Sequence, residues 1–185
     1  MGILGSLKPV RYFVSIIYQA LGDILGVEDM LVSHLGPIVS KTDSKPFSQT
    51  TYYEKEMGNK LLRRFILFKP LRGREELPAV KLMTNDLEAA TSADGRRTFN
   101  VDPGYLSLEQ VILATTKGYS HRIYLDKGIF GDLTLIYING TYGSLPWTYP
   151  DYGGTELISM LNCWRENYKR DLKDWSGSGK TPRAT

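Results

Sequence analysis

Asp102, in the segment FNVDPGYLS (99–107), is the first candidate for a residue that binds a ligand or takes part in catalysis. Residues 97–101 predict a short strand that ends just before this aspartate. The SLEQ sequence that follows matches a capping box, so a helix is expected over 108–117. Asp102 would then lie near the free N–H groups of a helix start, where a carboxylate is stabilised.

Two interpretations of Asp102 stay open. In one, its carboxylate takes part in a ligand site or in catalysis, while Pro103 stiffens the turn and Gly104 permits close backbone approach. In the other, it closes an Asx-type turn onto its own loop. Tyr105 correspondingly either covers such a site or packs in the core with its hydroxyl satisfied.

A second group of charged residues lies in YYEKEMG (52–58) and shortly after it. Glu54 and Glu56 are two positions apart, and Arg63 follows within a short loop or a helical turn or two. Two carboxylates facing a guanidinium group can bind a metal and a phosphorylated ligand, or carry out acid/base chemistry. The alternative is an ion-pair network that fixes the loop.

His121 and Arg122 open the predicted strand HRIYL, in which alternation sends them to opposite faces. Only one of them is therefore expected to share a site with Asp102. His121 is the best candidate for proton transfer near neutral pH, with a purely structural role as the alternative. Since His34, His121 and Cys163 show no close ligand spacing, histidine-based zinc binding is not expected, and both metal and cofactor stay unassigned.

The segment PWTYPDYGG (146–154) combines two prolines with aromatic residues around Asp151. Such a stiff loop can stack a base or a sugar, or recognise a partner peptide. It can equally clamp the last helix onto the sheet, which is the interpretation favoured for Trp147. Tyr149 and Asp151 are retained as candidate ligand-binding residues.

Several separate blocks resemble one known family, in the same order along roughly residues 9–173. They are YYEKEMG (52–58), RRF (63–65), NVDPGYL (100–106), ATTK (114–117), HRIYL (121–125) and PWTYPDY (146–152). Together they resemble an uncharacterised bacterial family with a domain of unknown function, whose members are sometimes labelled GTP-binding. The resemblance implies a bacterial, cytoplasmic setting and leaves the activity open. Lys117, in the ATTK block, joins the candidate ligand-binding residues.

No nucleotide-binding signature accompanies that label. GSGKT (177–181) imitates part of a P-loop, but the position that needs another glycine holds Asp174, and too little chain follows to form the required helix. The sequence also has no G-x-G-x-x-G fingerprint. Nucleotide binding therefore rests on no motif.

The remaining pattern predicts the elements that position these residues. Strands are expected at 11–18 and 65–68, extended segments at 38–41 and 47–53, and helices within 23–35, over about 84–93 and from 155 onward. HRIYL, IFGDLTLIYI and YGSLPW predict a three-strand antiparallel meander, with Asn139-Gly140 as a hairpin turn. The fold class is α+β: one domain with a mixed or mostly antiparallel sheet, helices chiefly on one face, and a long helix after the meander. A ferredoxin-like split arrangement is an option for the first half.

Composition limits the function. The 185 residues carry a net charge of +3, which by itself indicates neither a nucleic acid nor an anionic membrane as partner. A single cysteine excludes an internal disulfide framework and is compatible with the cytoplasm, and no apolar run is long enough to span a membrane. The expected organisation is an extension at 1–8, a domain at 9–175 and a disordered tail at 176–185. The oligomeric state is left open.

Two classes of function remain. The first is a pocket in which Asp102, Glu54, Glu56, Arg63 and His121 converge on a small phosphorylated or otherwise anionic ligand, nucleotides included, with or without catalysis. The second is a non-catalytic module for protein or RNA that uses Tyr149, Tyr152, Arg122 and the basic loops 72–74 and 96–97. Convergence of acidic and basic side chains in one deep pocket favours the first class, and a flat basic surface with exposed aromatics favours the second.

Overall fold

The computed structural model describes residues 7–19, 24–92 and 95–175. Its strands are β1 (Val10–Gln19), β2 (Ile38–Lys41), β3 (Lys45–Pro46), β4 (Leu61–Arg72), β5 (Phe99–Leu106), β6 (Gln110–Thr115), β7 (Arg122–Asp126), β8 (Ile129–Ile138) and β9 (Thr141–Ser144). Its helices are α1 (Ile24–Leu35), α2 (Glu54–Met57), α3 (Leu77–Ala90) and α4 (Thr155–Asp174), with a short 3₁₀ turn at Arg74–Glu76. The α+β class and the long last helix are confirmed.

All nine strands of this described part belong to one sheet, ordered β2-β4-β1-β5-β6-β8-β7, with β3 beside β4 and β9 beside β8. Every pairing is antiparallel. Because β2 and β1 are both antiparallel to the β4 between them, they run in the same direction, and so do β4 and β5 on either side of β1. The units β1–α1–β2 and β4–α3–β5 therefore interleave, which is the ferredoxin-like split arrangement that the sequence left as an option for the first half.

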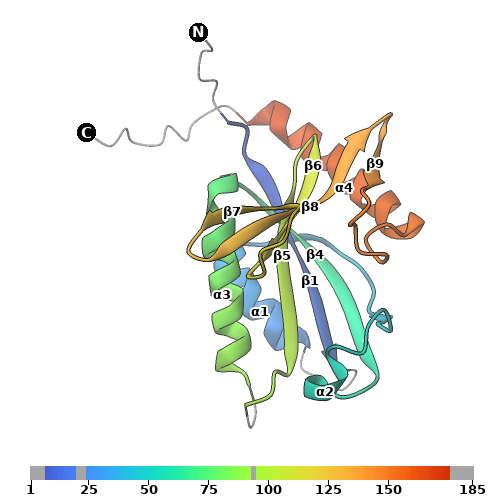
Figure 1. Cartoon of the computed structure of the whole chain (residues 1–185). Helices are drawn as coiled ribbons and strands as arrows, with labels where there is room; N and C mark the ends of the chain where they lie inside the picture. The colour runs from blue at the N-terminus through green and yellow to red at the C-terminus, as the bar shows by residue number, and fades with distance from the viewer. Residues whose placement is uncertain (1–6, 20–23, 93–94, 176–185) are drawn as a thin grey trace.

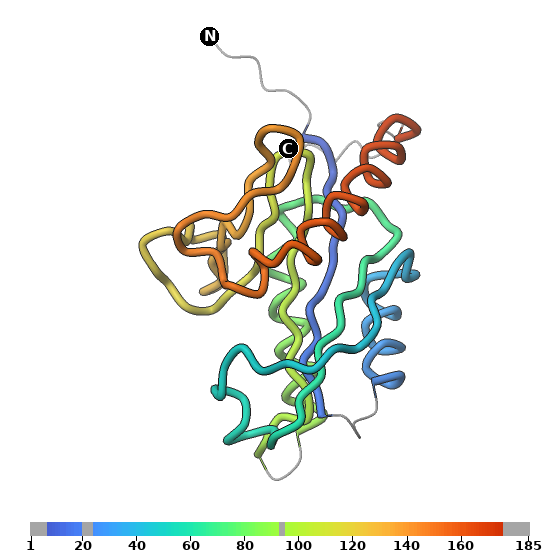
Figure 2. The backbone as a smooth tube through the Cα atoms, turned by 90° about the vertical axis from the view of Figure 1, so that its right-hand side faces the viewer, coloured from blue at the N-terminus to red at the C-terminus, as the bar shows by residue number. Residues whose placement is uncertain are grey.

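The core has two layers, one on each face of the sheet. Alternate residues of β1 point to opposite faces: Tyr12 and Val14 pack in the cluster that includes α1 and α3, whereas Phe13 packs in the cluster that includes α4. Figure 1 shows α1 and α3 on one side of the long strands, and Figure 2 shows α4 crossing near one end of them. Since helices cover both sides of β1, its apolar residues are almost completely buried.

The helix expected over 108–117 is wrong, because these residues form the turn after β5 and the strand β6. Ser107 does accept bonds from the backbone N–H groups of Glu109 (3.2 Å) and Gln110 (3.1 Å), as a helix cap would. Here these bonds close the turn between β5 and β6, with Ser107 N donating to Gln110 O at 2.9 Å. The apolar side chains of β6 are buried on both faces, an environment that favours a strand over a one-sided helix.

Asp102 does not end a strand either, since β5 continues through Asp-Pro-Gly-Tyr to Leu106. Residues 47–53 are irregular rather than extended, and the second helix occupies 77–90 instead of about 84–93. The two antiparallel hairpins of the expected meander are present, although β7 and β9 pair with the same edge of β8, because β6 occupies the other edge. Asn139 (φ 54°) and Gly140 (φ 85°) have the positive φ values of the β8–β9 hairpin turn.

The terminal segments 1–6 and 176–185, the second of which contains GSGKT, lie outside the described residues. Among the residues described, no helix combines the length and apolar character needed to cross a bilayer.

Candidate functional site

A pocket of about 520 Å³ lies where β5 and β6 separate, on the sheet face that also carries α4. Arg63 of β4, Lys81 and Glu88 of α3 and Asp102 of β5 contribute charged side chains to its lining. Its other walls come from the loop at 47–53, the end of β6 at 113–117 and the loop at 149–152. Side chains distant in the sequence therefore converge on one space.

A second hollow, of about 680 Å³, lies beside α4. Glu156 is the only charged residue in its described lining, and the remainder includes Ser40, Met160, Cys163 and Trp164. Although this hollow is the larger one, it lacks convergent charged groups, so the pocket beside β5 is the better candidate site.

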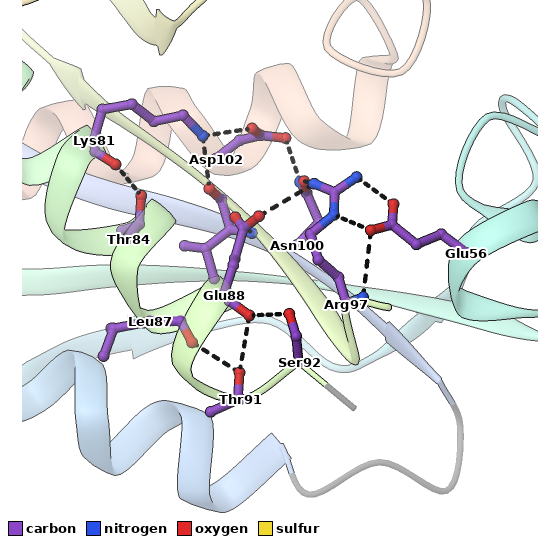
Figure 3. A network of polar contacts seen from close by, with 11 residues as sticks. Glu56, Lys81, Thr84, Leu87, Glu88, Thr91, Ser92, Arg97, Asn100 and Asp102 are labelled. Carbon is purple, nitrogen blue, oxygen red and sulfur yellow. Dashed lines mark hydrogen bonds and ion pairs between the residues drawn. The ribbon is translucent and has the colours of Figure 1, made fainter. Parts of the chain in front are cut away.

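The open edge of β5 explains how helix side chains reach the pocket. β5 pairs with β6 only from Gly104↔Leu113 to Leu106↔Val111, so the backbone before Gly104 has no strand partner on that side. Side chains of α3 take the place of the missing strand: Glu88 accepts the Val101 N–H at 2.7 Å, and Lys81 donates to the Val101 carbonyl at 3.1 Å. Figure 3 shows Lys81 and Glu88 of α3 beside β5. The exposed strand edge is thereby satisfied without a neighbouring strand.

Pro103 and Gly104 fit the same interpretation. Backbone groups of alternate strand residues point to the same side, so position 103, like Val101, faces the edge that β6 has left. Proline has no N–H that would need a partner there. A Cβ on Gly104 would lie 2.5 Å from the Ile112 carbonyl oxygen and 2.8 Å from Leu113 Cδ2. Asp-Pro-Gly therefore marks the point where two strands part, rather than a chain turn.

Asp102 and Arg97 belong to one polar network on this edge (Figure 3). Lys81 Nζ is 3.3 Å from one oxygen of Asp102, and Asn100 Nδ2 donates to the other at 2.9 Å. Arg97 binds Asn100 Oδ1 at 2.8 Å, Glu88 at 3.1 Å and both carboxylate oxygens of Glu56.

This network shifts the pKa values of two carboxyl groups in opposite directions. Hydrogen bonds from Arg97 hold the pKa of Glu56 below its ordinary value. Burial raises the pKa of Glu88, against the opposing effect of the Val101 N–H and its two cationic neighbours. The site therefore contains carboxylates with different affinities for protons.

Arg63 forms a second cluster across the pocket. Its Nε donates to Ser15 Oγ at 2.7 Å, and its Nη1 donates to Asp151. The guanidinium carbon lies 4.5 Å from the ring centroid of Phe65 and 5.0 Å from that of Tyr152. Burial raises the pKa of Tyr152 to about 12. Arg63 is thus held by a carboxylate and stacked aromatic rings, which fixes the loop at 149–152 against the sheet.

Asp132 of β8 organises a third cluster. Its carboxylate is almost completely buried, and one oxygen accepts from Arg122 Nε at 2.9 Å and lies 3.3 Å from His121 Nε2. The His121 ring stacks on Trp147 with a centroid distance of 5.0 Å. Arg122 also donates to the Tyr149 hydroxyl at 2.8 Å. Asp132 therefore connects the start of β7 with the loop that borders the pocket.

The family model described as Domain of unknown function (DUF4416) matches residues 8–168. The chain belongs to this family. No curated protein and no solved structure matches it. The expected resemblance to a family of unknown function is confirmed.

Most of the sequence candidates lie at or near the pocket. Its lining includes Arg63, Asp102, Lys117, Tyr149 and Asp151. Glu56 and Arg122 contact lining residues, Arg97 and Asp132 respectively. His121 is connected to the pocket wall through Asp132. The expected separation of His121 and Arg122 on opposite faces is wrong, because His121 precedes β7 and both side chains contact the carboxylate of Asp132.

Two candidates lie elsewhere. Glu54 is exposed in the first turn of α2 and is not part of the pocket lining. Tyr105 is buried in the α1/α3 layer, with its ring 6.1 Å from that of Tyr12. Of the alternatives left open for Tyr105, the core position is the one observed.

Sequence reasoning missed Lys81, Glu88, Asn100 and Asp132, and it considered Arg97 only as part of a basic loop. Asp132 could have been identified from the sequence, because it is a charged residue inside the apolar run IFGDLTLIYI. The sequence indicates Lys81 less clearly, as a charged residue among the apolar residues on the buried side of α3. Among the described residues, no three His, Cys, Asp or Glu side chains are grouped so as to hold a metal ion.

Proposed function

We propose that this protein binds a small ligand carrying a phosphate or another anionic group in the pocket beside β5, with nucleotides among the candidates. The observation that carries the proposal is the convergence of acidic and basic side chains from α3, β4, β5, β8, the segment after β6 and the loop at 149–152 on one space. A volume of about 520 Å³ is typical of sites for small molecules.

The chemistry of the lining supports a polar ligand with an aromatic or sugar-like part. Tyr52, Tyr53, Tyr149 and Phe47 line the pocket beside the charged residues and offer faces on which a ring can stack. The charged groups are held in place by mutual contacts, so they are positioned before a ligand arrives, which lowers the entropy lost on binding.

Any proton transfer to or from such a ligand is assigned within this proposal to Asp102. A general acid or base must come within hydrogen-bonding reach of the reacting group. Asp102 lines the pocket, whereas His121 is not among the described lining residues and contacts Asp132 and Trp147 instead. His121 is accordingly given a positioning role, through the carboxylate of Asp132.

The contacts of the basic loops weigh against a protein- or RNA-binding module. Arg72 is bound to Glu76, Arg97 to Glu56, and Arg122 to Asp132. Tyr152 is buried rather than available to a partner. These side chains would have to break internal contacts before they could bind a large partner. A cytoplasmic setting in a bacterium belongs to the same proposal and is compatible with the single cysteine.

The test is a thermal-shift screen of the full chain against nucleotides, sugar phosphates, inorganic phosphate and divalent cations. A ligand that binds the native state stabilises it by mass action, by about 2.7 kcal/mol when the ligand concentration is a hundred times its Kd. The melting temperature rises accordingly. The variant Asp102→Asn keeps the size of the side chain but replaces one carboxylate oxygen, an acceptor for donor groups of the ligand, with an amide N–H donor. We expect it to reduce the shift of compounds that carry hydroxyl or N–H donors.

Asp43→Asn is the matched control, because Asp43 is an exposed aspartate outside the pocket lining. It should bind like the wild type. If no compound changes the melting temperature, or if both variants lose the shift equally, the pocket is not the binding site and the proposal fails.

A further inference from the structure

The separation of β5 and β6 places two particular groups on opposite walls of the pocket. The strands pair at Gly104↔Leu113, Tyr105↔Ile112 and Leu106↔Val111. If this register continued, Asp102 would face Thr115 and Asn100 would face Lys117. The strands have parted by then, and all of these residues line the pocket instead. A ligand in the pocket thus lies between the polar side chains of β5 and those at the end of β6.

The wall at the end of β6 offers an unmatched positive charge. Arg63, Lys81 and Arg97 each have a carboxylate within ion-pair distance. Lys117 has none among the residues that the structure describes, and its ammonium group lies 4.9 Å from the ring centroid of Tyr52. Lys117 is exposed, and because its charge is not neutralised internally it is the lining cation most available to an anionic ligand.

Thr115 and Thr116, which both carry hydroxyl groups, line the same wall next to Lys117. Thr115 Oγ1 accepts the backbone N–H of Lys117 at 3.2 Å, which holds the bend that follows β6. A phosphate group has several terminal oxygens that accept hydrogen bonds, and it therefore suits a cluster of one ammonium and two hydroxyl donors better than a carboxylate does.

The β5 wall offers an acceptor instead. Glu88 and Asp132 are almost completely buried, and their acceptor positions are used by Val101, Arg97, Arg122 and Thr134. The Asp102 side chain is 34% exposed, and each of its oxygens has one internal donor. A carboxylate accepts about four hydrogen bonds, so Asp102 retains capacity for donors such as the hydroxyl groups of a ligand.

From these two walls we infer that the ligand is a phosphorylated sugar or polyol, with its phosphate at Thr115–Lys117 and its hydroxyl groups at Asp102. This inference rests on the proposed function, because it specifies the ligand of the same pocket. Lys117 determines the preference for phosphorylated compounds, and Asp102 determines the preference for hydroxylated ones.

The test is isothermal titration calorimetry with ribose 5-phosphate, glucose 6-phosphate, glycerol 3-phosphate, the unphosphorylated sugars and inorganic phosphate. At least one sugar or polyol phosphate should bind more tightly than its own sugar and than inorganic phosphate. Lys117→Gln should weaken that compound about tenfold or more, since a charge-assisted bond is lost, and leave the affinity for the sugar unchanged. Asp102→Asn should weaken the same compound about tenfold, because a carboxylate acceptor for the ligand's hydroxyl groups is lost, and it should not weaken the binding of inorganic phosphate.

Lys173→Gln is the matched control, because Lys173 is exposed near the end of α4 and is not in the pocket lining. The melting temperature of each ligand-free variant shows whether it is folded. If nucleotides or other anions bind in the thermal-shift screen while no sugar or polyol phosphate does, or if Lys117→Gln binds like the wild type, this inference is overturned while the proposed pocket stands. Absence of binding by every compound overturns both.

Discussion

Replacing Gly104 with alanine should destabilise the protein and shift the end of β6. The added Cβ would lie 2.5 Å from the Ile112 carbonyl oxygen, 2.8 Å from Leu113 Cδ2 and 3.1 Å from Phe13 Cζ. The closest of these atoms belongs to the backbone, so the steric clash cannot be relieved by rotating a side chain. Overpacking of this kind costs about 1–3 kcal/mol. For a protein of this size, about 2–4 °C is lost per kcal/mol, and the melting temperature should fall by about 2–12 °C.

Gly143→Ala is the control for this experiment. Gly143 is also a strand glycine, but the nearest atom to its added Cβ is the Ile136 carbonyl oxygen at 3.9 Å. Neither glycine has a positive φ, so alanine introduces no backbone strain at either position. Gly143→Ala should leave the melting temperature unchanged or raise it slightly. Equal melting temperatures for the two variants in a calorimetric scan would refute the close packing of β5 against β6.

The remaining predictions concern buried and paired charges. Asp132→Asn should lower the free energy of unfolding by about 3 kcal/mol, because it leaves Arg122 without its buried carboxylate. Asp126→Asn, at the exposed end of β7, should change it by less than about 0.5 kcal/mol, and similar urea midpoints for the two variants would contradict the role of Asp132. Glu56 and Glu88 should give opposite pH dependences. The stabilisation from Glu56, whose folded pKa is lowered, is present above its ordinary value of 4.5 and is lost as the pH falls through the folded pKa, so the stability advantage over Glu56→Gln should shrink in acid. Glu88 has a raised folded pKa, so the wild type should lose stability relative to Glu88→Gln as the pH rises above 4.5 through the folded pKa. Urea titrations from pH 3 to 8 measure both, and parallel slopes would contradict the assignment.

The pattern at 107–110 shows why local signals can mislead. Ser107 makes the backbone contacts of a helix cap, and the sequence predicted a helix from them. A serine hydroxyl satisfies the two N–H groups that follow it in a tight turn as well as at a helix start. What decides between the two is whether strands lie on both sides of the next segment, and β5 and β8 do so for β6.

The pocket was predictable only in part. Arg63, Asp102, Lys117, Tyr149 and Asp151 were identified from their residue types and from the blocks that resemble the family, and the structure brings them together. Lys81 and Glu88 could not be identified in this way. They reach the pocket because β6 departs from β5 and leaves an edge that α3 must satisfy, and no local pattern in α3 records where a distant strand ends.

By itself, the sequence determined the elements that depend on short-range periodicity and turn chemistry. The apolar spacing of α4 and α1, the β-branched run of β1 and the Asn139-Gly140 turn depend on neighbouring residues, so they were read correctly. Only the tertiary structure decided that Asp102 lies in mid-strand on the wall of a pocket, because strand pairing joins residues far apart in the chain. The chemistry of the site depends on where that pairing stops, which is set by the packing of the whole sheet.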